Sequence, residues 1–298
     1  MLDMHRLRIL RELKHRGTLA AVAAAMAYAP SSISMQLSQL EEETGVPLLQ
    51  RVGRSVRLTP QAELLVSHTE ALLELMERAE ADLAASSHAI TGTVRLATFQ
   101  TVALALLPTA LGQLRAEHPQ LRVEISQLEP EQALPGLVAH DFDLVIAHEY
   151  PGHPLPRLPQ IEHQTLVRDR LHIAVPEELA DKQLRLADLA DRAWVMEQPG
   201  TPARRWCEAV CREAGFEPDV RYCSYDLQLH VKLVEAGEAV ALLPELVWAG
   251  AEPTVAQHGL ADPHSSRRIV AATRRGAHGH PAVLAVRQAL LRASAARR

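Results

Sequence analysis

The spacing of apolar residues changes once along the chain, near Gly92, and this change limits the possible folds more than any other feature. Before it, apolar side chains recur every three or four residues, which predicts helices. Beyond it, short alternating or wholly apolar runs that predict strands are interleaved with helical stretches. The chain, at 298 residues, also exceeds one typical domain. We therefore expect a helical N-terminal unit followed by an α/β unit.

Charge is divided unevenly between these units. Residues 1–60 carry a net charge of +3, whereas residues 61–91 carry −5, which equals the net charge of the whole chain. Binding to nucleic-acid phosphates requires local rather than total positive charge. The N-terminal unit is therefore the part of the chain that suits a phosphate-bearing partner.

The N-terminal unit has the pattern of a tight helix-turn-helix. An amphipathic first segment stops at Gly17, and Thr18 can cap the next helix through its hydroxyl. That second helix, residues 19–25, is dominated by alanine, which lets neighbouring helices approach closely. After a turn near residues 26–29, Pro30 suits the first position of a third helix. The buried stripe of this third helix is predicted to be Ile33, Leu37 and Leu40.

The third helix leaves a polar face at the end that a recognition helix presents to base edges. Its hydroxyl and carboxamide groups can read bases without desolvating a carboxylate beside phosphates. A predicted β-hairpin over residues 48–59 follows, and its arginines could hold phosphates or enter a minor groove. Taken alone, the serines could be helix caps and the arginines a solvated loop. The predicted DNA-contacting residues are Thr18, Ser31, Ser32, Ser34, Met35, Gln36, Gln39, Arg51, Arg54 and Arg57.

The order of residues in this region resembles the LysR-type transcriptional regulator family. The residues that carry the resemblance are Gly17, Thr18, Leu19, Ala23, Ala24, Ile33, Ser34, Gln36, Leu37, Leu40, Glu41, Gly45, Pro47, Leu48, Leu49, Arg51, Arg54, Leu58, Thr59 and Pro60. Three positions depart from the family pattern: Met35 replaces a frequent arginine, Leu49 a usual phenylalanine and Ala62 a common glycine. The resemblance implies a winged helix-turn-helix DNA-binding domain over residues 1–60.

Residues 60–89 contain no glycine and no internal proline and are rich in Leu, Ala and Glu, so they predict one long helix. Two heptad series, Leu65-Leu72-Ala79 and Thr69-Met76-Leu83, stand four residues apart and form an a/d seam that suits helix pairing. A helix packed on its own chain's core could show a similar stripe. The family resemblance implies dimerisation through this helix, as a homodimer or homotetramer. The predicted dimerisation residues are Leu65, Leu72, Met76, Ala79 and Leu83.

A hinge is expected at residues 86–92, and the α/β pattern begins beyond it. Strands are predicted over residues 93–98, 121–127, 144–147, 165–175 and 239–242, with a helix over 103–117. Such alternation predicts a mostly parallel sheet with helices on both faces. Ligands of these sheets bind beyond the carboxyl ends of the strands.

The family resemblance continues into this region with looser motifs, at residues 106–108, 141–146 and 235–244. It implies a linker helix and hinge over residues 61–91 and a two-lobed, periplasmic-binding-protein-like effector domain over 92–298. Lobe I would comprise about residues 92–166 and 270–298, and lobe II about 167–269. The chain would then cross between the lobes near Val167 and near Ile269.

The effector is expected between these lobes. Backbone N–H groups and hydroxyls between a strand end and a helix start could hold an anionic group such as a carboxylate, although the same residues could be simple helix caps. Aromatic residues make up only 3% of the chain, so an aromatic cage is not suggested. The predicted effector-binding residues are Thr98, Phe99, Gln100, Thr101, His148, Gln198, Pro199, Gly200, Thr201 and Tyr225.

These features predict a sequence-specific regulator of transcription that binds double-stranded DNA and is controlled by a small molecule. The resemblance implies that an effector favouring one lobe arrangement changes the spacing of the DNA-binding heads and thereby alters transcription. RNA polymerase is a further partner that the resemblance implies, and no membrane partner is expected because no stretch reaches about 20 apolar residues. We found no Walker loop, G-x-S-x-G or H-E-x-x-H motif, so we expect no enzyme activity, cofactor or metal site.

Two alternatives remain open. Three cysteines, Cys207, Cys211 and Cys223, are too sparse for a disulfide scaffold and suit the cytoplasm, but they would allow a thiol-based redox-sensing regulator. A disulfide between Cys207 and Cys211, one helical turn apart, would constrain little. Separately, the basic region and the apolar run 19–29 mimic a signal peptide, which would make the chain a secreted solute-binding protein. Asp3 and Glu12 interrupt that basic region and argue against it.

Overall fold

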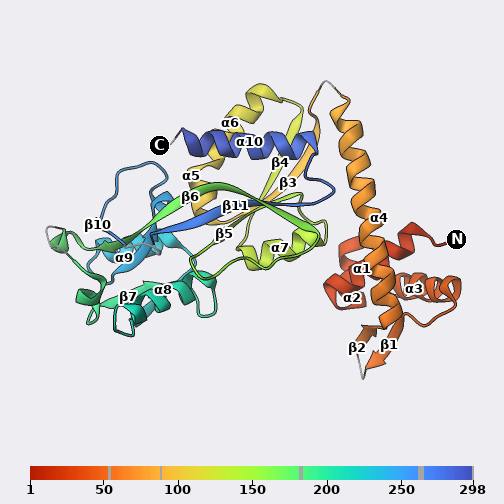
Figure 1. Cartoon of the computed structure of the whole chain (residues 1–298), viewed down its shortest axis with the longest axis horizontal. Helices are drawn as coiled ribbons and strands as arrows, with labels where there is room; N and C mark the ends of the chain where they lie inside the picture. The colour runs from red at the N-terminus through yellow and green to blue at the C-terminus, as the bar shows by residue number, and fades with distance from the viewer. Residues whose placement is uncertain (53–54, 88, 181–183, 261–264, 297–298) are drawn as a thin grey trace.

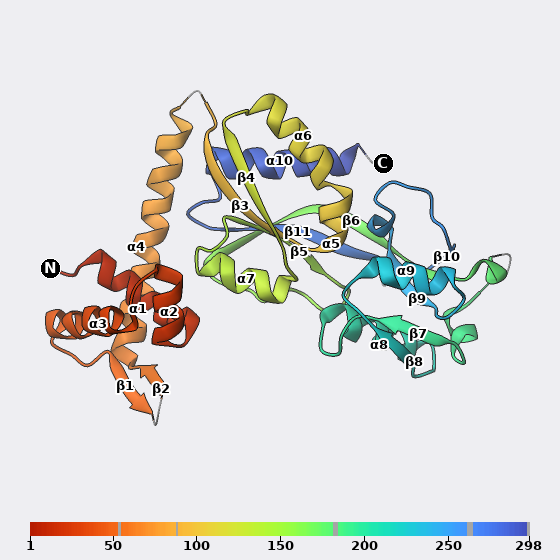
Figure 2. The same cartoon turned by 180° about the vertical axis from the view of Figure 1, so that it is seen from behind.

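The computed structural model describes residues 1–298 except 53–54, 88, 181–183, 261–264 and 297–298. A small helical head lies at one side and a larger α/β body at the other, and one long helix connects them (Figure 1). The view from behind shows the same division, with helix α7 of the body turned toward the head (Figure 2). No helix among the described residues is both long and apolar enough to span a bilayer.

The head contains three helices: α1 (Met4–Arg16), α2 (Leu19–Met26) and α3 (Pro30–Thr44). Gly17 ends α1 in a left-handed conformation at φ 76°, which glycine adopts without steric cost. The Thr18 hydroxyl then accepts a hydrogen bond from the backbone N–H of Ala21 at 3.1 Å and caps α2, as expected. Pro30 occupies the first turn of α3, which confirms the predicted start of this helix.

Ile33, Leu37 and Leu40 are buried in the head core, which confirms the stripe read from the sequence. The apolar run that mimics a signal peptide forms α2 and the turn after it, and Val22 and Ala23 of this run pack in the same core. The first turns of α4 (Pro60–Ala85) complete that core through Ala62 and Val66.

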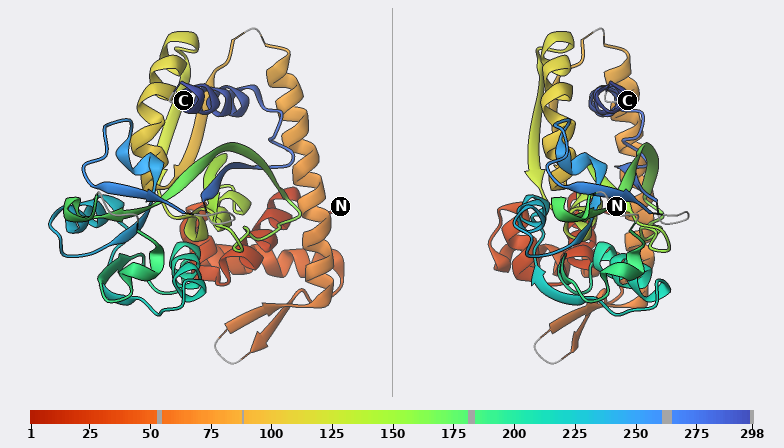
Figure 3. Two further views of the ribbon diagram at one scale, coloured as in Figure 1. Left: turned by 60° about the vertical axis from the view of Figure 1, so that its left-hand side comes forward. Right: turned by 90° about the vertical axis from the view of Figure 1, so that its left-hand side faces the viewer.

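The predicted hairpin is present as β1 (Leu49–Val52) and β2 (Ser55–Leu58), an antiparallel pair. The two strands lie below the helices of the head in both views of Figure 3. Helix α4 follows and has 26 residues, about 39 Å at the usual rise per residue. It ends at Ala85 rather than Ala89, where the N–H of Ser86 bonds the last helical carbonyls.

The part of the body next to α4 is a sheet with helices on both faces. Its elements are β3 (Gly92–Thr98), α5 (Gln100–Ala105), α6 (Leu107–Glu117), β4 (Leu121–Gln127), α7 (Pro130–Val138), β5 (Leu144–Glu149) and α10 (Pro281–Ala295). Helices α5, α6 and α10 share one apolar cluster, whereas α7 packs in another cluster with Ala97 and Val145. The single helix expected over 103–117 is divided at Leu106, because Pro108 in the first turn of α6 cannot continue the preceding helix.

The far part of the body is reached by two long strands, β6 (Ile161–Val175) and β11 (Ser266–Arg274). Its other strands and α-helices are β7 (Ala193–Met196), α8 (Pro202–Glu213), β8 (Asp219–Cys223), α9 (Leu227–Glu235), β9 (Ala241–Pro244) and β10 (Ala256–Gly259). Its short 3₁₀ turns are η1 (Glu177–Leu179), η2 (Leu186–Leu189) and η3 (Glu245–Trp248). Val167 and Ile269, the predicted crossing points, are direct partners in the β6–β11 ladder, beside a register shift.

The expectation of a mostly parallel sheet is wrong. The strand order is β10-β6-β11-β5-β3-β4, with β9 also paired to β6. Only β3–β4 and β3–β5 are parallel among the described pairs of this sheet, because β6 and β11 run antiparallel to each other and to their other neighbours. β7 and β8 form a separate parallel pair. The sheet is mixed because β6 runs from the near part of the body to the far part, and β11 runs back beside it in the opposite direction.

Candidate DNA-binding surface and effector site

Helix α3 presents its polar candidates on the face away from the head core. Ser31, Ser34 and Met35 are exposed, whereas Ser32, Gln36 and Gln39 are half-buried beside them. Met35 is 54% exposed, so an apolar side chain stands on a surface that is otherwise hydroxyl- and amide-bearing. This face can approach base edges because the opposite face is held in the core.

The structure adds Arg6, on α1, to this surface. Its Nε donates to Oε1 of Gln36 at 3.1 Å. Its Nη1 pairs with the carboxylate of Glu43. Gln36 is therefore oriented by a neighbouring helix. Sequence reasoning missed this contact because the two residues are 30 positions apart. Thr18 already caps α2, so a DNA contact from its hydroxyl would be made in addition to that structural role.

Arg51 and Arg57 of the wing are both exposed but lie on opposite faces of the hairpin. Gln50 is the register partner of Arg57, and Val56 is the partner of Arg51. Cross-strand partners share a face and successive residues alternate, so the two guanidinium groups project to different sides. Arg54 lies outside the described residues. Among the described residues, each side of the wing therefore carries one of these two arginines.

The free face of α4 overlaps the predicted dimerisation seam in its C-terminal half. Leu72, Met76, Ala79 and Leu83 are exposed, and Leu83 is 72% exposed. Leu65 instead packs against the head core, and Thr69 is fully buried within its own chain. The own-chain packing that the sequence left open therefore applies to the first half of the helix. Leu64 and Leu75, at 62% and 60% exposure, belong to the free surface and were not predicted.

Three predicted effector residues, Phe99, Thr101 and His148, lie around the buried guanidinium of Arg267, on β11. Phe99 and His148 stack edge to face at 4.6 Å between ring centres, and Thr101 accepts a hydrogen bond from Arg267 Nη2 at 2.7 Å. The Oγ1 of Thr98 and the Nδ1 of His148 are buried without a hydrogen-bond partner among the described residues. Both atoms can therefore form a hydrogen bond with a bound molecule.

Arg267 was missed by sequence reasoning, although a signal existed. It lies two residues before Ile269 on a strand, and therefore on the same buried face. Its Nη2 pairs with Asp169 of β6 at 2.8 Å, and its Nη1 donates to the Tyr150 hydroxyl at 3.2 Å. Burial alone would lower the pKa of Arg267, but Tyr150 and Asp169 hold it above its ordinary value.

Gln100 and the loops beyond it join the two parts of the body. Its Nε2 donates to Asp226 at 2.6 Å, and its Oε1 accepts from the N–H of Leu227, at the start of α9, at 2.9 Å. Tyr225 stands beside this contact and is 48% exposed. Gln198 and Thr201 lie in the turn before α8, which Thr201 caps, together with exposed Pro199 and Gly200. The candidates thus occupy both sides of the boundary between the lobes.

Two carboxyl groups that sequence reasoning missed face this same boundary. Burial raises the pKa of Glu129, at the N-cap of α7, to about 7, with a contribution from Glu131. Burial raises the pKa of Glu197, just after β7, to about 7 as well, with repulsion from Glu129 as the next cause. The charge of Glu129 therefore adds to the effect of burial on the pKa of Glu197. Each has a pKa that lets it gain or lose a proton near neutral pH.

The two cysteines of α8 are poor candidates for redox chemistry. Cys207 and Cys211 are buried free thiols. Burial raises the pKa of Cys207 well above its usual value and that of Cys211 to about 12. The thiolate is the reactive form, so both side chains are held in the unreactive state. Cys223 is exposed, and its sulfur lies 3.6 Å from Arg204 Nη1.

Comparison with known proteins assigns both ends of the chain. Residues 4–63 match the model of the bacterial regulatory helix-turn-helix protein, lysR family, and residues 87–295 match the LysR substrate binding domain. The transcriptional dual regulator GltC of Bacillus subtilis (strain 168) is 28% identical over 255 residues, which cover 85% of this chain and 84% of GltC.

Solved structures share the fold over nearly the whole length. A full-length OxyR variant from Pseudomonas aeruginosa superposes with a TM-score of 0.70 at 18% identity, covering 97% of this chain and 95% of that one. Full-length CbnR complexed with its target DNA gives 0.54 at 23% identity, covering 97% and 99%. The chain belongs to the LysR family of DNA-binding transcriptional regulators, which are not enzymes, and carries that family's effector-binding domain behind its helix-turn-helix.

Proposed function

We propose that this regulator recognises its operator with the exposed face of α3 and with the wing arginines. The observation that carries this proposal is the division of α3 into a buried apolar face and an exposed face of Ser31, Ser34, Met35 and neighbouring amides. Serine and glutamine side chains supply the donors and acceptors that base edges require. Arg51 and Arg57 add phosphate contacts or a minor-groove contact on either side of the hairpin.

The proposed operator is a two-fold site read by a homodimer, or by two dimers of a homotetramer. The free C-terminal half of α4 carries Leu72, Leu75, Met76 and Leu83 on its exposed surface. Their spacing of three, four and seven residues suits pairing with a second copy of the helix. One head contacts few base pairs, and two-fold pairing doubles the length of DNA that is read.

The proposed effector is a small polar molecule that binds between the lobes. The unpartnered Oγ1 of Thr98 lies at the end of β3, and the unpartnered Nδ1 belongs to His148 of β5, which packs against Phe99. Gln100 bonds to Asp226 and Leu227 on the other side of the boundary. A carboxylate on the effector would approach Glu129 and Glu197, and its negative charge would raise the pKa of both groups further. Binding near pH 7 would therefore be accompanied by the uptake of a proton by at least one of these glutamates. We further propose that the regulator acts in the cytoplasm, where DNA and RNA polymerase, its remaining proposed partner, are found.

Selection of random duplexes by the full-length protein tests the DNA-binding surface. We expect the wild type to enrich one two-fold sequence, and Ser34→Ala combined with Gln36→Ala to relax the choice at two or three base pairs per half-site. Ser126→Ala, at an exposed position on β4, is the control and should enrich the wild-type sequence. Unchanged enrichment by the Ser34/Gln36 variant would contradict the assignment of α3 as the reading helix.

A further inference from the structure

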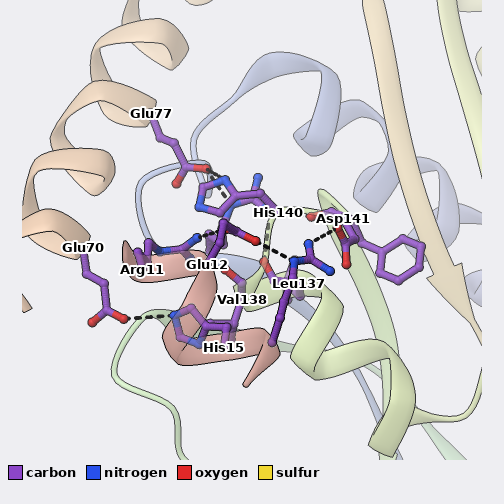
Figure 4. Close-up of polar contacts among 12 residues, drawn as sticks. Arg11, Glu12, His15, Glu70, Glu77, Leu137, Val138, His140 and Asp141 are labelled. Atoms are coloured by element: carbon purple, nitrogen blue, oxygen red, sulfur yellow. Dashed lines mark hydrogen bonds and ion pairs between the residues drawn. The ribbon is translucent and has the colours of Figure 1, made fainter. Parts of the chain in front are cut away.

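The head is docked on the effector domain of its own chain. Arg11, on α1, is only 4% exposed and donates from Nη2 to the backbone carbonyl of Val138, the last residue of α7. Arg16, one turn and a half further along α1, pairs with Asp141 at 2.7 Å. Both arginines are also held by Glu12, at 3.0 Å and 2.7 Å (Figure 4). We call the contacts of Arg11 and Arg16 on α1, and of Glu70 and Glu77 on α4, with the effector domain the junction.

Helix α4 joins the same junction from the other side. Glu70 accepts hydrogen bonds from His15 of the head at 3.2 Å and from Gln160 of the body at 2.8 Å. Glu77 pairs with Arg274 at 2.5 Å and with His140 at 3.3 Å (Figure 4). Each glutamate therefore has a partner in the effector domain. The long helix is attached laterally to the domain that follows it and not only through the chain at residues 86–92.

Gly276 shows how closely the effector domain approaches α4. A β-carbon at this position would lie 2.5 Å from the backbone oxygen of Glu74 and 2.8 Å from the β-carbon of Glu77. Its φ is not in the left-handed region, so other residues could adopt the same backbone. Glycine is therefore required at position 276 only because α4 lies so close. A methyl group at position 276 would therefore push the two domains apart.

The junction is polar and incompletely filled, which suits a contact that can open. A cavity of about 220 Å³ lies between α1, α4 and the body, and Arg11, Glu70, His140 and Arg274 contribute to its lining. The Nε of Arg11 is buried there without a hydrogen-bond partner among the described residues. A contact held by ion pairs around such a space lacks the dry apolar area that makes a domain interface permanent.

Helix α7 reaches from the junction to the lobe boundary. Along its length α7 packs on the crossing strand β11, because Ala133 and Leu137 share an apolar cluster with Val270 and Ala272. At its C-terminal end the carbonyls of Leu137 and Val138 accept hydrogen bonds from Arg274 and Arg11. The helix has only nine residues, so a shift at one end moves the other. Both regions that the proposed function requires therefore touch one short element.

We propose that α7 couples the arrangement of the lobes to the position of the head, through the docked junction. This proposal rests on the proposed function for the meaning of the coupling, but not for its existence. When the lobes move, α7 shifts against Arg11 and Arg274, the junction weakens and the head with α4 takes a different angle to the body. The surface formed by the C-terminal end of α7 and Asp141 is thus a docking site for the head of the same chain.

Hydrogen exchange of the full-length chain without DNA or effector tests the docking. Gly276→Ala should speed exchange about tenfold in residues 137–142 of the junction and in α1, because the contacts that limit opening are lost. Gly279→Ala is the matched control, since a β-carbon there has no atom within 4 Å. Arg11→Met should reproduce the effect by removing the Val138 contact while keeping a buried chain. Unchanged exchange in Gly276→Ala and Arg11→Met would overturn the docking.

A double-mutant cycle tests the coupling. Gln100→Ala removes two of the hydrogen bonds that link the lobes and should by itself speed exchange of α1. In the Gly276→Ala background it should have less than about a third of that effect, because the route through the junction is already broken. Equal effects in both backgrounds, or no effect of Gln100→Ala on α1, would overturn the proposal. Tryptophan fluorescence, which reports Trp194, Trp206 and Trp248 in the far lobe, checks that each variant is folded.

These outcomes are separable from those of the DNA-binding experiment. A wild-type protein that selects no operator but shows the expected exchange pattern would refute the proposed function and retain the coupling. A protein that selects an operator while Gly276→Ala exchanges like Gly279→Ala would do the reverse.

Discussion

The guanidinium of Arg11 donates to the backbone carbonyl of Val138, a residue 127 positions further along the chain. The donor lies in the DNA-binding head and the acceptor at the C-terminal end of a helix in the effector domain. Helix C-termini carry partial negative charge on their last carbonyls, so they attract guanidinium groups. Arg274 reaches the preceding carbonyl, of Leu137, at 3.1 Å. Two arginines from different domains thus converge on one helix end.

The wing should make a phosphate contact that salt weakens. Arg57→Ala is expected to lower operator affinity and to reduce the slope of log affinity against log salt concentration by about one, because one phosphate contact is lost. Fluorescence anisotropy with a labelled operator, at several salt concentrations, measures both quantities. Arg185→Ala, whose side chain is 82% exposed in the far lobe, is the control and should leave affinity and slope unchanged.

The free half of α4 should control assembly. Leu83→Glu combined with Met76→Glu places two charges on a surface that we expect to be buried between two copies, so dimers should dissociate at concentrations where the wild type is dimeric. Sedimentation velocity over a concentration series gives the result. Val46→Glu, on an exposed apolar residue of the head, is the control. A sedimentation profile of the α4 variant identical to that of the wild type would remove this face from the dimer.

The far lobe should lose stability as the pH rises toward neutrality. The pKa of Glu197 is raised from 4.5 to about 7, so the folded protein keeps a proton that the unfolded chain releases. The stabilising effect of that proton is present at low pH and is lost between about pH 4.5 and 7, at a cost on the order of 1–3 kcal/mol. His148, whose pKa burial lowers, has the opposite dependence. The comparison must therefore be between wild type and Glu197→Gln.

Urea unfolding followed by tryptophan fluorescence at pH 5.5 and pH 8 makes this comparison. The unfolding free energy of the wild type should fall from pH 5.5 to pH 8, because Glu197 loses its stabilising proton. The fall should be smaller in Glu197→Gln, because the amide does not titrate. Glu177→Gln, at an exposed position of η1, is the matched control. If Glu197→Gln and Glu177→Gln respond to pH in the same way, the carboxyl at 197 does not titrate as described.

The buried pair of Arg267 and Asp169 should be costly to break on one side only. Both side chains are 1% exposed, so Asp169→Asn leaves an uncompensated buried guanidinium and should lower the unfolding free energy by about 3–5 kcal/mol. Replacing both residues, as Asp169→Asn with Arg267→Met, should cost less than the sum of the single changes. Asp188→Asn breaks an exposed pair with Arg185 and should lower the unfolding free energy far less than Asp169→Asn does. Additive effects in the buried pair would contradict this account.

Local sequence was sufficient for the head. The left-handed Gly17, the cap at Thr18 and Pro30 at the start of α3 each act over a few residues, and all three are present as expected. The hairpin and the long helix follow from patterns of similar range, although α4 ends four residues early. The division of the helix expected over 103–117 was the local failure, because Pro108 interrupts a helix whose apolar pattern is continuous.

Chain direction and side-chain partnership depended on the tertiary structure. Periodicity identifies a strand but not its direction, so the antiparallel β6 and β11 were invisible to it. The effector candidates were placed by strand ends, whereas Arg267, Glu129 and Glu197 acquire their chemistry from burial by segments far away in the sequence. Which half of α4 is free was likewise decided by the head packing on Leu65 and Thr69.

The amino-acid order alone therefore determined a helix-turn-helix head, a long linker helix and an α/β body, because capping, periodicity and turns operate between near neighbours. Only the folded chain decided that Arg11 meets Val138 and that Gly276 lies against α4. Those contacts depend on how two separately folding units dock, and docking is set by surface charge and shape that no local pattern encodes.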